Sequence, residues 1–238
     1  PDEMLIDKIG SEAHRGIARQ AVRESLVLLK NDNNSLPLSK EGKKIVVVGE
    51  HANNTGLQSG GWTISWQGKD ESYKGGTTIL DGINAITDGE VVYDEHGTKD
   101  IDADVAIVVV GETPYAEFFG DIRDENSTYQ LQLTSEHKKY IENYRGKVDK
   151  LVVILVSGRP LVVTDQINRS DAFVAAWLLG SEGEGIAEVL FGDYDFSGIL
   201  PHSWPKSVAD FDGKYGPNYW DSSIEPLYEL GYGLKYQK

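Results

Sequence analysis

The chain has 238 residues, enough for one sizeable α/β domain or two small ones, and its 39% hydrophobic and 26% charged residues are ordinary for a globular protein. Its formal net charge of −15 argues against a nucleic-acid or anionic-membrane surface and is compatible with a neutral ligand such as a sugar. There is no cysteine, which excludes disulfides, thiolate nucleophiles and cysteine metal sites. No apolar run approaches the roughly 18 residues needed to span a bilayer, so we do not expect this chain to be an integral membrane protein.

The first predicted element is a helix over residues 12–30, with one apolar face. That face contains Ile17, Ala21, Val22, Leu26 and Leu29. We expect residues 1–40 to be a linker and entry helix, and residues 41–238 to form the α/β domain. The chain begins with Pro1 and has no targeting segment, so we expect it to be a piece of a longer protein.

Strongly apolar runs further along predict strands that are buried on both faces. They lie at 45–49, 107–110, 151–156 and 172–178, with a shorter strand at 91–93. Helical patterns alternate with them, at 78–87, 134–144, 160–168 and 185–190. Thr134 is predicted to be the N-cap of its helix, with His137 at the third helical position.

This alternation predicts an α/β fold: a doubly wound, mostly parallel sheet flanked by helices, an α/β sandwich with right-handed crossovers. From residue 194 onward glycine, proline and aromatic residues predict an irregular C-terminal tail, with an edge strand near 227–234. In open parallel sheets, ligands bind outside the carboxyl ends of the strands. The loops 50–76 and 112–133 leave those ends and contain the residues of interest.

The segment AIVVVGETPYAEFFGD (106–121) takes the chain from a buried strand into an acidic loop. Glu112 and Glu117 lie there among Tyr115, Phe118 and Phe119. A carboxyl group among aromatic rings suits a general acid, because desolvation favours its protonated form. The alternative is a solvated acidic loop with no catalytic role.

Two tryptophans, Trp62 and Trp66, lie in the segment GGWTISWQG (60–68) of the other loop. Indole faces bury much area and stack on the C–H faces of pyranose rings, so these residues suit a carbohydrate site. Alternatively, each tryptophan only packs its own loop onto the sheet.

Other chemistries find little support, and we expect neither a metal site nor a cofactor. GSEGEG (180–185) does not match G-x-G-x-x-G, and its two glutamates would repel phosphate. The histidines are scattered without an H-x-x-x-H spacing, and there is no G-x-S-x-G elbow. The sequons at Asn33, Asn53, Asn126 and Asn168 are weak evidence for glycosylation.

Six blocks occur in order along the chain: SLVLLKND…LPL (25–38), GGWTISWQG (60–68), VVVGETPYAEFFGD (108–121), LVSGRPLVV (155–163), AAWLLGSEGEGIAEVLFGDYDFSGILPHSWP (175–205) and LYELGYGL (227–234). Together they resemble the second, α/β-sandwich domain of glycoside hydrolase family 3, and most closely that of its exo-acting β-glucan glucohydrolases and β-glucosidases. The resemblance covers nearly the whole chain. It implies a retaining mechanism on terminal β-D-glucosyl residues, at a site between this domain and an N-terminal TIM-like barrel that supplies the nucleophile.

By the same resemblance, Glu117 matches the general acid/base, Trp66 the wall of the aglycone subsite, and Trp62 its less certain companion. Glu112 is the second choice for the acid, or a loop anchor, and Asp121 could orient the loop. The substrate would be a β-glucoside or a β-glucan oligosaccharide, and the location secreted or periplasmic.

No segment matches the family's nucleophile motif. A retaining glycosidase needs two carboxyl groups about 5–5.5 Å apart. We therefore expect the chain alone to be inactive. The alternative function is a non-catalytic carbohydrate-binding or interaction module of the same fold.

Overall fold

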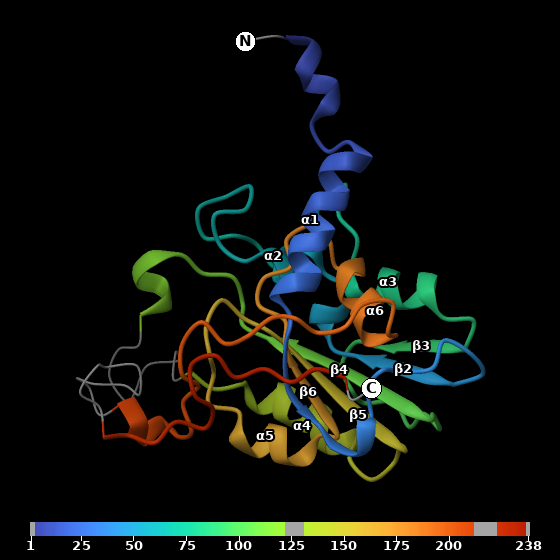
Figure 1. The fold of residues 1–238 in the computed structure, drawn as a ribbon, viewed down its shortest axis with the longest axis vertical. Coiled ribbons are helices and arrows are strands. Elements are labelled where there is room, and N and C mark those ends of the chain that lie inside the picture. The colour runs from blue at the N-terminus through green and yellow to red at the C-terminus, as the bar shows by residue number, and fades with distance from the viewer. Residues whose placement is uncertain (1–2, 122–130, 212–222, 237–238) are drawn as a thin grey trace.

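The computed structural model describes residues 3–121, 131–211 and 223–236, and in them a single six-stranded sheet lies between two layers of helices (Figure 1). The strand order is β1-β6-β5-β4-β2-β3, and every neighbouring pair is parallel except the antiparallel β1 and β6. The strands are β1 (Val27–Asn31), β2 (Ile45–Val48), β3 (Val91–Asp94), β4 (Val105–Gly111), β5 (Lys150–Val156) and β6 (Ala172–Ala175). The predicted α/β sandwich with a mostly parallel sheet is confirmed.

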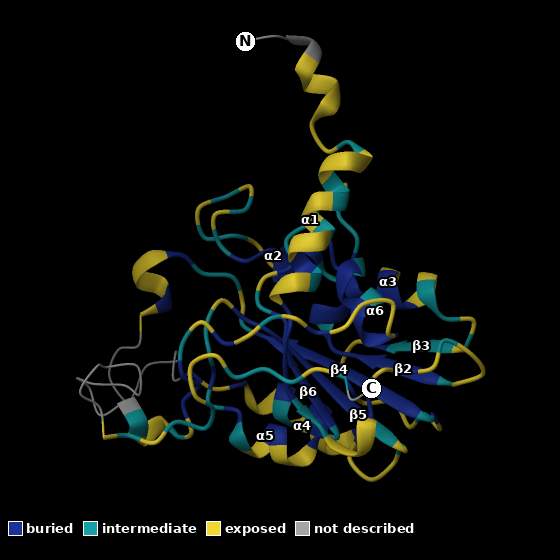
Figure 2. Cartoon of the chain, viewed as in Figure 1, coloured by how far each residue is buried: buried dark blue, intermediate teal, exposed yellow. Residues whose placement is uncertain are grey.

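Helices cover both faces of this sheet, so the strands in its middle are buried on both sides (Figures 1 and 2). One layer contains α1 (Glu12–Ser25), α3 (Ile79–Ile86) and α6 (Glu184–Leu190); the other contains α4 (Ser135–Tyr144) and α5 (Thr164–Arg169). The short helix α2 (Thr55–Ser59) and the 3₁₀ turns η1 (Glu3–Lys8), η2 (Asp32–Asn34), η3 (Glu50–Asn53), η4 (Glu117–Gly120) and η5 (Val208–Phe211) complete the described elements. Successive side chains of a strand enter opposite cores: Ile107 and Val109 pack with α3 and α6, whereas Val108 and Val110 pack with α4.

Local sequence signals fix where the helices begin. The hydroxyl of Thr134 accepts a hydrogen bond of 3.1 Å from the backbone N–H of His137, so the predicted N-cap is confirmed. Thr78 and Asp81 form a reciprocal capping box at the start of α3, with bonds of 3.0 and 2.9 Å.

The predicted helix over 12–30 is confirmed up to Ser25 and wrong for residues 26–30. Helix α1 ends at Ser25, and Val27–Asn31 is the edge strand β1, so the sheet begins within residues 1–40. Leu28 enters one core while Val27 and Leu29 enter the other, which is the two-residue period of a strand. Ile17, a member of the predicted apolar face, is 69% exposed.

The C-terminal tail packs over the sheet without forming the predicted strand near 227–234. It makes two isolated bridges, Trp204 with Tyr228 and Leu28 with Leu234. Trp204 is fully buried, and its indole N–H donates to the carbonyl of Leu161 at 2.8 Å. In the described part of the chain, no helix has both the length and the apolar character needed to cross a bilayer.

Candidate functional site

Loops from three neighbouring strands meet at the carboxyl edge of the sheet. The segment after β2 contains Trp62 and Trp66, the segment after β4 contains both candidate glutamates, and the segment after β5 contains Arg159. They enclose a hollow of about 140 Å³. It is lined by Gly60, Gly61, Glu112, Thr113, Pro114, Tyr115, Ser157, Gly158 and Leu178. The predicted meeting of the tryptophan loop and the acidic loop is therefore present in the fold.

Glu112, the first residue after β4, is the anchor of the acidic loop. Its Oε1 accepts hydrogen bonds from Nε and Nη2 of Arg159 at 3.0 and 2.7 Å, and its Oε2 accepts one from the Tyr115 hydroxyl at 3.3 Å. Both side chains of the ion pair are mostly buried, with 15% of Glu112 and 19% of Arg159 exposed. Both carboxylate oxygens of Glu112 are therefore engaged at the base of the loop.

Arg159 also holds the far end of the loop. Its Nη1 donates to the carbonyl of Gly120, and its guanidinium lies 4.5 Å from the centre of the Tyr115 ring. Gly120 rests on that ring, and a Cβ at this position would collide with it. Burial and the charge of Glu112 raise the pKa of Tyr115 to about 12, so its hydroxyl stays a donor at neutral pH.

Glu117 lies at the exposed tip of the same loop, as the first residue of η4. Its backbone has a φ of 51°, a left-handed conformation that costs free energy in a non-glycine residue and is often found at functional positions. Its neighbour Ala116 is held from the tryptophan loop, because its N–H donates to Oε1 of Gln67 at 2.9 Å. Among the described residues, the Glu117 carboxyl group has no hydrogen-bond or ion-pair partner.

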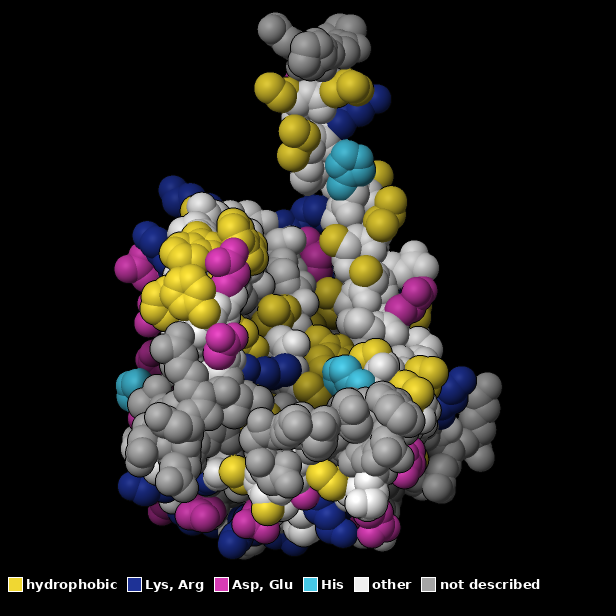
Figure 3. Space-filling view, turned by 90° about the vertical axis from the view of Figure 1, so that its left-hand side faces the viewer, with side chains coloured by type: hydrophobic (Ala, Val, Ile, Leu, Met, Phe, Trp, Pro, Cys, Tyr) yellow, Lys and Arg dark blue, Asp and Glu magenta, His cyan; other side chains and the backbone are white. Residues whose placement is uncertain are grey.

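Four aromatic side chains form an exposed cluster beside Glu117, which we call the aromatic cluster: Trp62, Trp66, Phe118 and Phe119. The ring of Trp66 is at its centre, 6.5 Å from Trp62, 5.8 Å from Phe118 and 6.0 Å from Phe119. Between 41% and 68% of each side chain is exposed. Figure 3 shows hydrophobic side chains gathered on this face, with acidic side chains and a hollow next to them.

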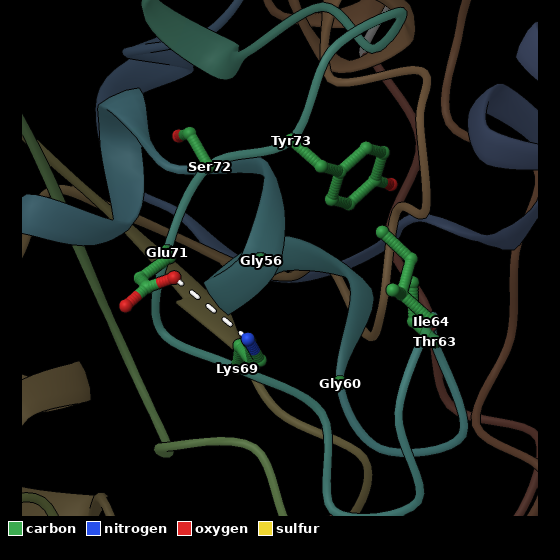
Figure 4. A pocket seen from close by; sticks show the side chains of 8 residues that line it. All are labelled: Gly56, Gly60, Thr63, Ile64, Lys69, Glu71, Ser72 and Tyr73. Atoms are coloured by element: carbon green, nitrogen blue, oxygen red, sulfur yellow. Dashed lines mark ion pairs between the residues drawn. The ribbon is translucent and has the colours of Figure 1, made fainter.

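The tryptophan loop is folded against its own base rather than extended. Tyr73 donates its backbone N–H to the hydroxyl of Thr55 at 2.9 Å, and its phenol lies 2.7 Å from the hydroxyl of Ser59. A second hollow of about 160 Å³ lies inside this loop (Figure 4). It is lined by Gly56, Gly60, Thr63, Ile64, Lys69, Glu71, Ser72 and Tyr73. Trp62 and Ile64 both have positive φ and are exposed.

Asp121, the third acidic candidate, is exposed, and its carboxylate has no partner among the described residues. Arg159 contacts both ends of this loop, through Glu112 and Gly120. Sequence reasoning missed Arg159, although its position directly after a buried strand at the ligand edge was a signal that could have found it.

A second group that sequence reasoning missed lies below the loop, where η3 meets α4. Oε1 of Glu50 is 2.6 Å from Nε2 of His137 and 3.5 Å from Nδ1 of His51. Burial acts to raise the pKa of Glu50, but the hydrogen bond with His137 and the nearby His51 ring outweigh it and hold that pKa well below its usual range. Nε2 of His51 is 3.2 Å from the carbonyl oxygen of Glu112, which links this group to the anchor of the acidic loop.

Comparison with known proteins gives consistent matches across the chain. The model of the glycosyl hydrolase family 3 C-terminal domain matches residues 26–236. The lysosomal beta glucosidase of Dictyostelium discoideum is 32% identical over 99% of the chain, and the periplasmic beta-glucosidase of Salmonella typhimurium is 31% identical over 95%. The chain spans only 31% and 35% of these two relatives, about a third of their length.

Solved structures agree with these matches. An exo-1,3/1,4-beta-glucanase from a Pseudoalteromonas species superposes with a TM-score of 0.87 at 40% identity, covering all of this chain and 39% of that one. A beta-glucosidase from Listeria innocua superposes with a TM-score of 0.81 at 26% identity, covering all of this chain and 36% of that one. The chain therefore belongs to glycosyl hydrolase family 3, where it matches the C-terminal domain.

Proposed function

We propose that this chain is the acid/base domain of a retaining, exo-acting β-glucosidase or β-glucanase. Glu117 is its general acid/base, and Trp66, with Trp62, forms the wall of the aglycone subsite. The observation that carries the proposal is the contrast between two carboxyl groups of one loop. Glu112 is held by Arg159 and Tyr115, whereas Glu117 is exposed beside the aromatic cluster and has no partner among the described residues.

In this proposal Glu117 first donates a proton to the glycosidic oxygen as the aglycone leaves, and then accepts a proton from the water that releases the sugar. The nucleophile comes from an N-terminal TIM-like barrel. The length of the relatives supports this partner, because the chain spans about a third of them. Docking of the barrel and a bound sugar would also exclude water from Glu117, which is exposed in this chain.

Aryl β-glucosides of graded leaving-group ability test the role of Glu117 in the full-length protein. We expect Glu117→Gln to lower kcat/KM by about 10²- to 10⁴-fold for poor leaving groups and little for activated ones, because only poor leaving groups need a proton. Asp121→Asn, an exposed carboxylate in the same loop, is the matched control. A loss that is equal across all leaving groups, or no loss, would contradict the proposal.

The 238-residue chain by itself is expected to be inactive, since one carboxyl group cannot serve as both nucleophile and acid. The measurement is release of the aryl group from an activated β-glucoside by the purified chain. Turnover above that of the chain's own Glu117→Gln variant would contradict this expectation.

A second candidate function is a non-catalytic carbohydrate-binding module, favoured by the exposure of Trp62 and Trp66 (68% and 41%). It predicts that gluco-oligosaccharides change the tryptophan fluorescence of the chain alone, in a saturable way that Trp66→Ala abolishes. An unchanged signal would exclude it. For either function we propose a β-glucan oligosaccharide or β-glucoside as ligand, and a secreted or periplasmic location, in keeping with the periplasmic relative.

A further inference from the structure

Glu50, His51 and His137 come together although they lie on separate elements. Glu50 and His51 are in η3, directly after β2, and His137 is in the first turn of α4. Each residue offers one ligand atom, and these three atoms lie within 4.8 Å of one another. Only 2% of the His51 side chain and 7% of the His137 side chain are exposed. Two imidazoles and a carboxylate are a donor set that Zn²⁺ and similar divalent transition metals prefer.

The hydrogen bonding of His51 leaves a buried nitrogen without a partner. The carbonyl of Glu112 can only accept, so Nε2 of His51 carries the hydrogen in their 3.2 Å contact. In the neutral ring, Nδ1 then carries a lone pair and points toward Oε1 of Glu50, 3.5 Å away. Nδ1 of His51 is buried and has no hydrogen-bond partner in the described part of the chain. Nδ1 of His51 and Oε1 of Glu50 are then two acceptors that face each other, and a cation between them would satisfy both.

His137 faces Glu50 through its other nitrogen: its Nε2 is 2.6 Å from Oε1 of Glu50. Among the described residues, the buried atoms Oε2 of Glu50 and Nδ1 of His137 have no hydrogen-bond partner. At tetrahedral ligand distances, neighbouring donor atoms lie about 3.3 Å apart. The 3.5 Å between Glu50 and His51 already fits this spacing. The 2.6 Å between Glu50 and His137 would have to open by roughly 0.7 Å.

The contact between Nε2 of His51 and a backbone carbonyl is the support that metal-binding histidines usually have, because it fixes the tautomer and the ring orientation. We propose that Glu50, His51 and His137 bind one divalent transition-metal ion of the Zn²⁺ type. Three protein ligands leave one position for water. The ion would tie the end of β2 to α4 and, through His51, to the carbonyl of Glu112 where the acidic loop begins. The proposal is independent of the glycosidase function.

Direct binding to the chelator-treated chain tests this site. Titration with Zn²⁺ alone is expected to give one saturable site per chain, and titration with Co²⁺ the visible absorption bands of a low-symmetry nitrogen and oxygen site. Zn²⁺ is also expected to raise Tm. His51→Gln and His137→Gln should each weaken binding by more than about tenfold and remove the rise in Tm.

His96→Gln is the matched control, because His96 is exposed and lies outside the cluster. It should bind Zn²⁺ as the unchanged chain does. Circular dichroism without metal shows whether each variant folds. If His51→Gln does not fold, Glu50→Gln keeps the side-chain shape and removes the charged ligand, and should weaken binding as strongly. Absence of binding, or equal binding by His51→Gln, His137→Gln and His96→Gln, would overturn the proposal.

Discussion

Glu112 and Glu117 leave the same strand in the same loop, yet their surroundings differ because of one arginine. Arg159 binds the carboxylate of Glu112 through two nitrogens and the carbonyl of Gly120 through a third. The planar guanidinium can make these bonds together, which a lysine ammonium on a flexible stem cannot. Arg159 is thus a positioning residue: it fixes both ends of the segment that presents Glu117.

Replacing Arg159 by lysine should therefore loosen the acidic loop. We expect Arg159→Lys to lower the free energy of unfolding by about 1–3 kcal/mol, because one charged hydrogen bond replaces a bidentate pair and the Gly120 carbonyl loses its donor. Urea unfolding of the chain measures the change.

Arg145→Lys is the control for this experiment. Arg145 forms an ion pair of 3.3 Å with Asp171, but 46% of its side chain is exposed. We expect a loss below about 1 kcal/mol there. Equal losses at Arg145 and Arg159 would show that Arg159 does not hold the loop in the way described.

At the scale of elements, η4 depends on a glycine for close contact. Gly120 packs flat on the Tyr115 ring, so Gly120→Ala should push η4 away from the loop base. We expect a loss of about 1–3 kcal/mol in the free energy of unfolding, and weaker near-ultraviolet circular dichroism from the aromatic cluster. Gly16→Ala is the control: Gly16 lies in α1 with nothing near its added methyl, and alanine there should stabilise the chain slightly. A Gly120→Ala chain as stable as the unchanged one would contradict the contact.

The contact between the starts of β2 and β4 predicts a pH dependence of stability. The Asp104 carboxylate accepts a hydrogen bond of 2.8 Å from the backbone N–H of Lys44 and forms an ion pair of 3.2 Å with Lys43. These two contacts hold the pKa of Asp104 below its usual value. A carboxyl group whose pKa is lower in the folded state adds stability above its unfolded pKa of about 3.9, and loses it as the pH falls through the folded value.

We therefore expect Asp104→Asn to be less stable than the unchanged chain near neutral pH, and the difference to shrink below about pH 4. Urea unfolding at several pH values measures it. Asp100→Asn is the control for removing a surface charge, since the Asp100 side chain is 95% exposed. A difference for Asp104→Asn that stays constant with pH would contradict the role of the carboxylate.

The sequence was sufficient for elements whose signals are local. The buried strands β2, β4 and β5 read as apolar runs, and Thr134 begins its helix as its side-chain chemistry predicts. It was not sufficient for β1, because LVLLK suits the apolar face of a helix as well as a strand. Only pairing with β6, far along the chain, decides between them.

The candidate site also has parts that the sequence could predict and parts that it could not. The loops with Glu117 and Trp66 could be placed at one edge because parallel strands end together, and their contact follows from the topology. The link from Arg159 to Glu112 joins residues 47 positions apart, and the link from His137 to Glu50 joins residues 87 apart. No spacing rule covers such pairs, since they depend on side-chain directions after folding.

For the molecule as a whole, the proposed function places half of a catalytic pair at the carboxyl edge of the sheet. The aromatic cluster and Glu117 are exposed on this chain, so their proposed partner surface is the barrel with its bound sugar. Because the barrel would supply the nucleophile, removing Glu117 should leave the first step possible for substrates that need no proton. The sugar–enzyme intermediate should then accumulate for want of a base.

Azide rescue of Glu117→Gly in the full-length protein tests the role of Glu117 most directly. Glycine accepts the positive φ at this position and leaves space for a small anion. With an activated aryl β-glucoside, azide is expected to restore turnover and to yield β-glucosyl azide, because it attacks the intermediate without a base. Absence of rescue by azide in Glu117→Gly, together with rescue in Glu112→Gly, would contradict the assignment and make Glu112 the acid/base.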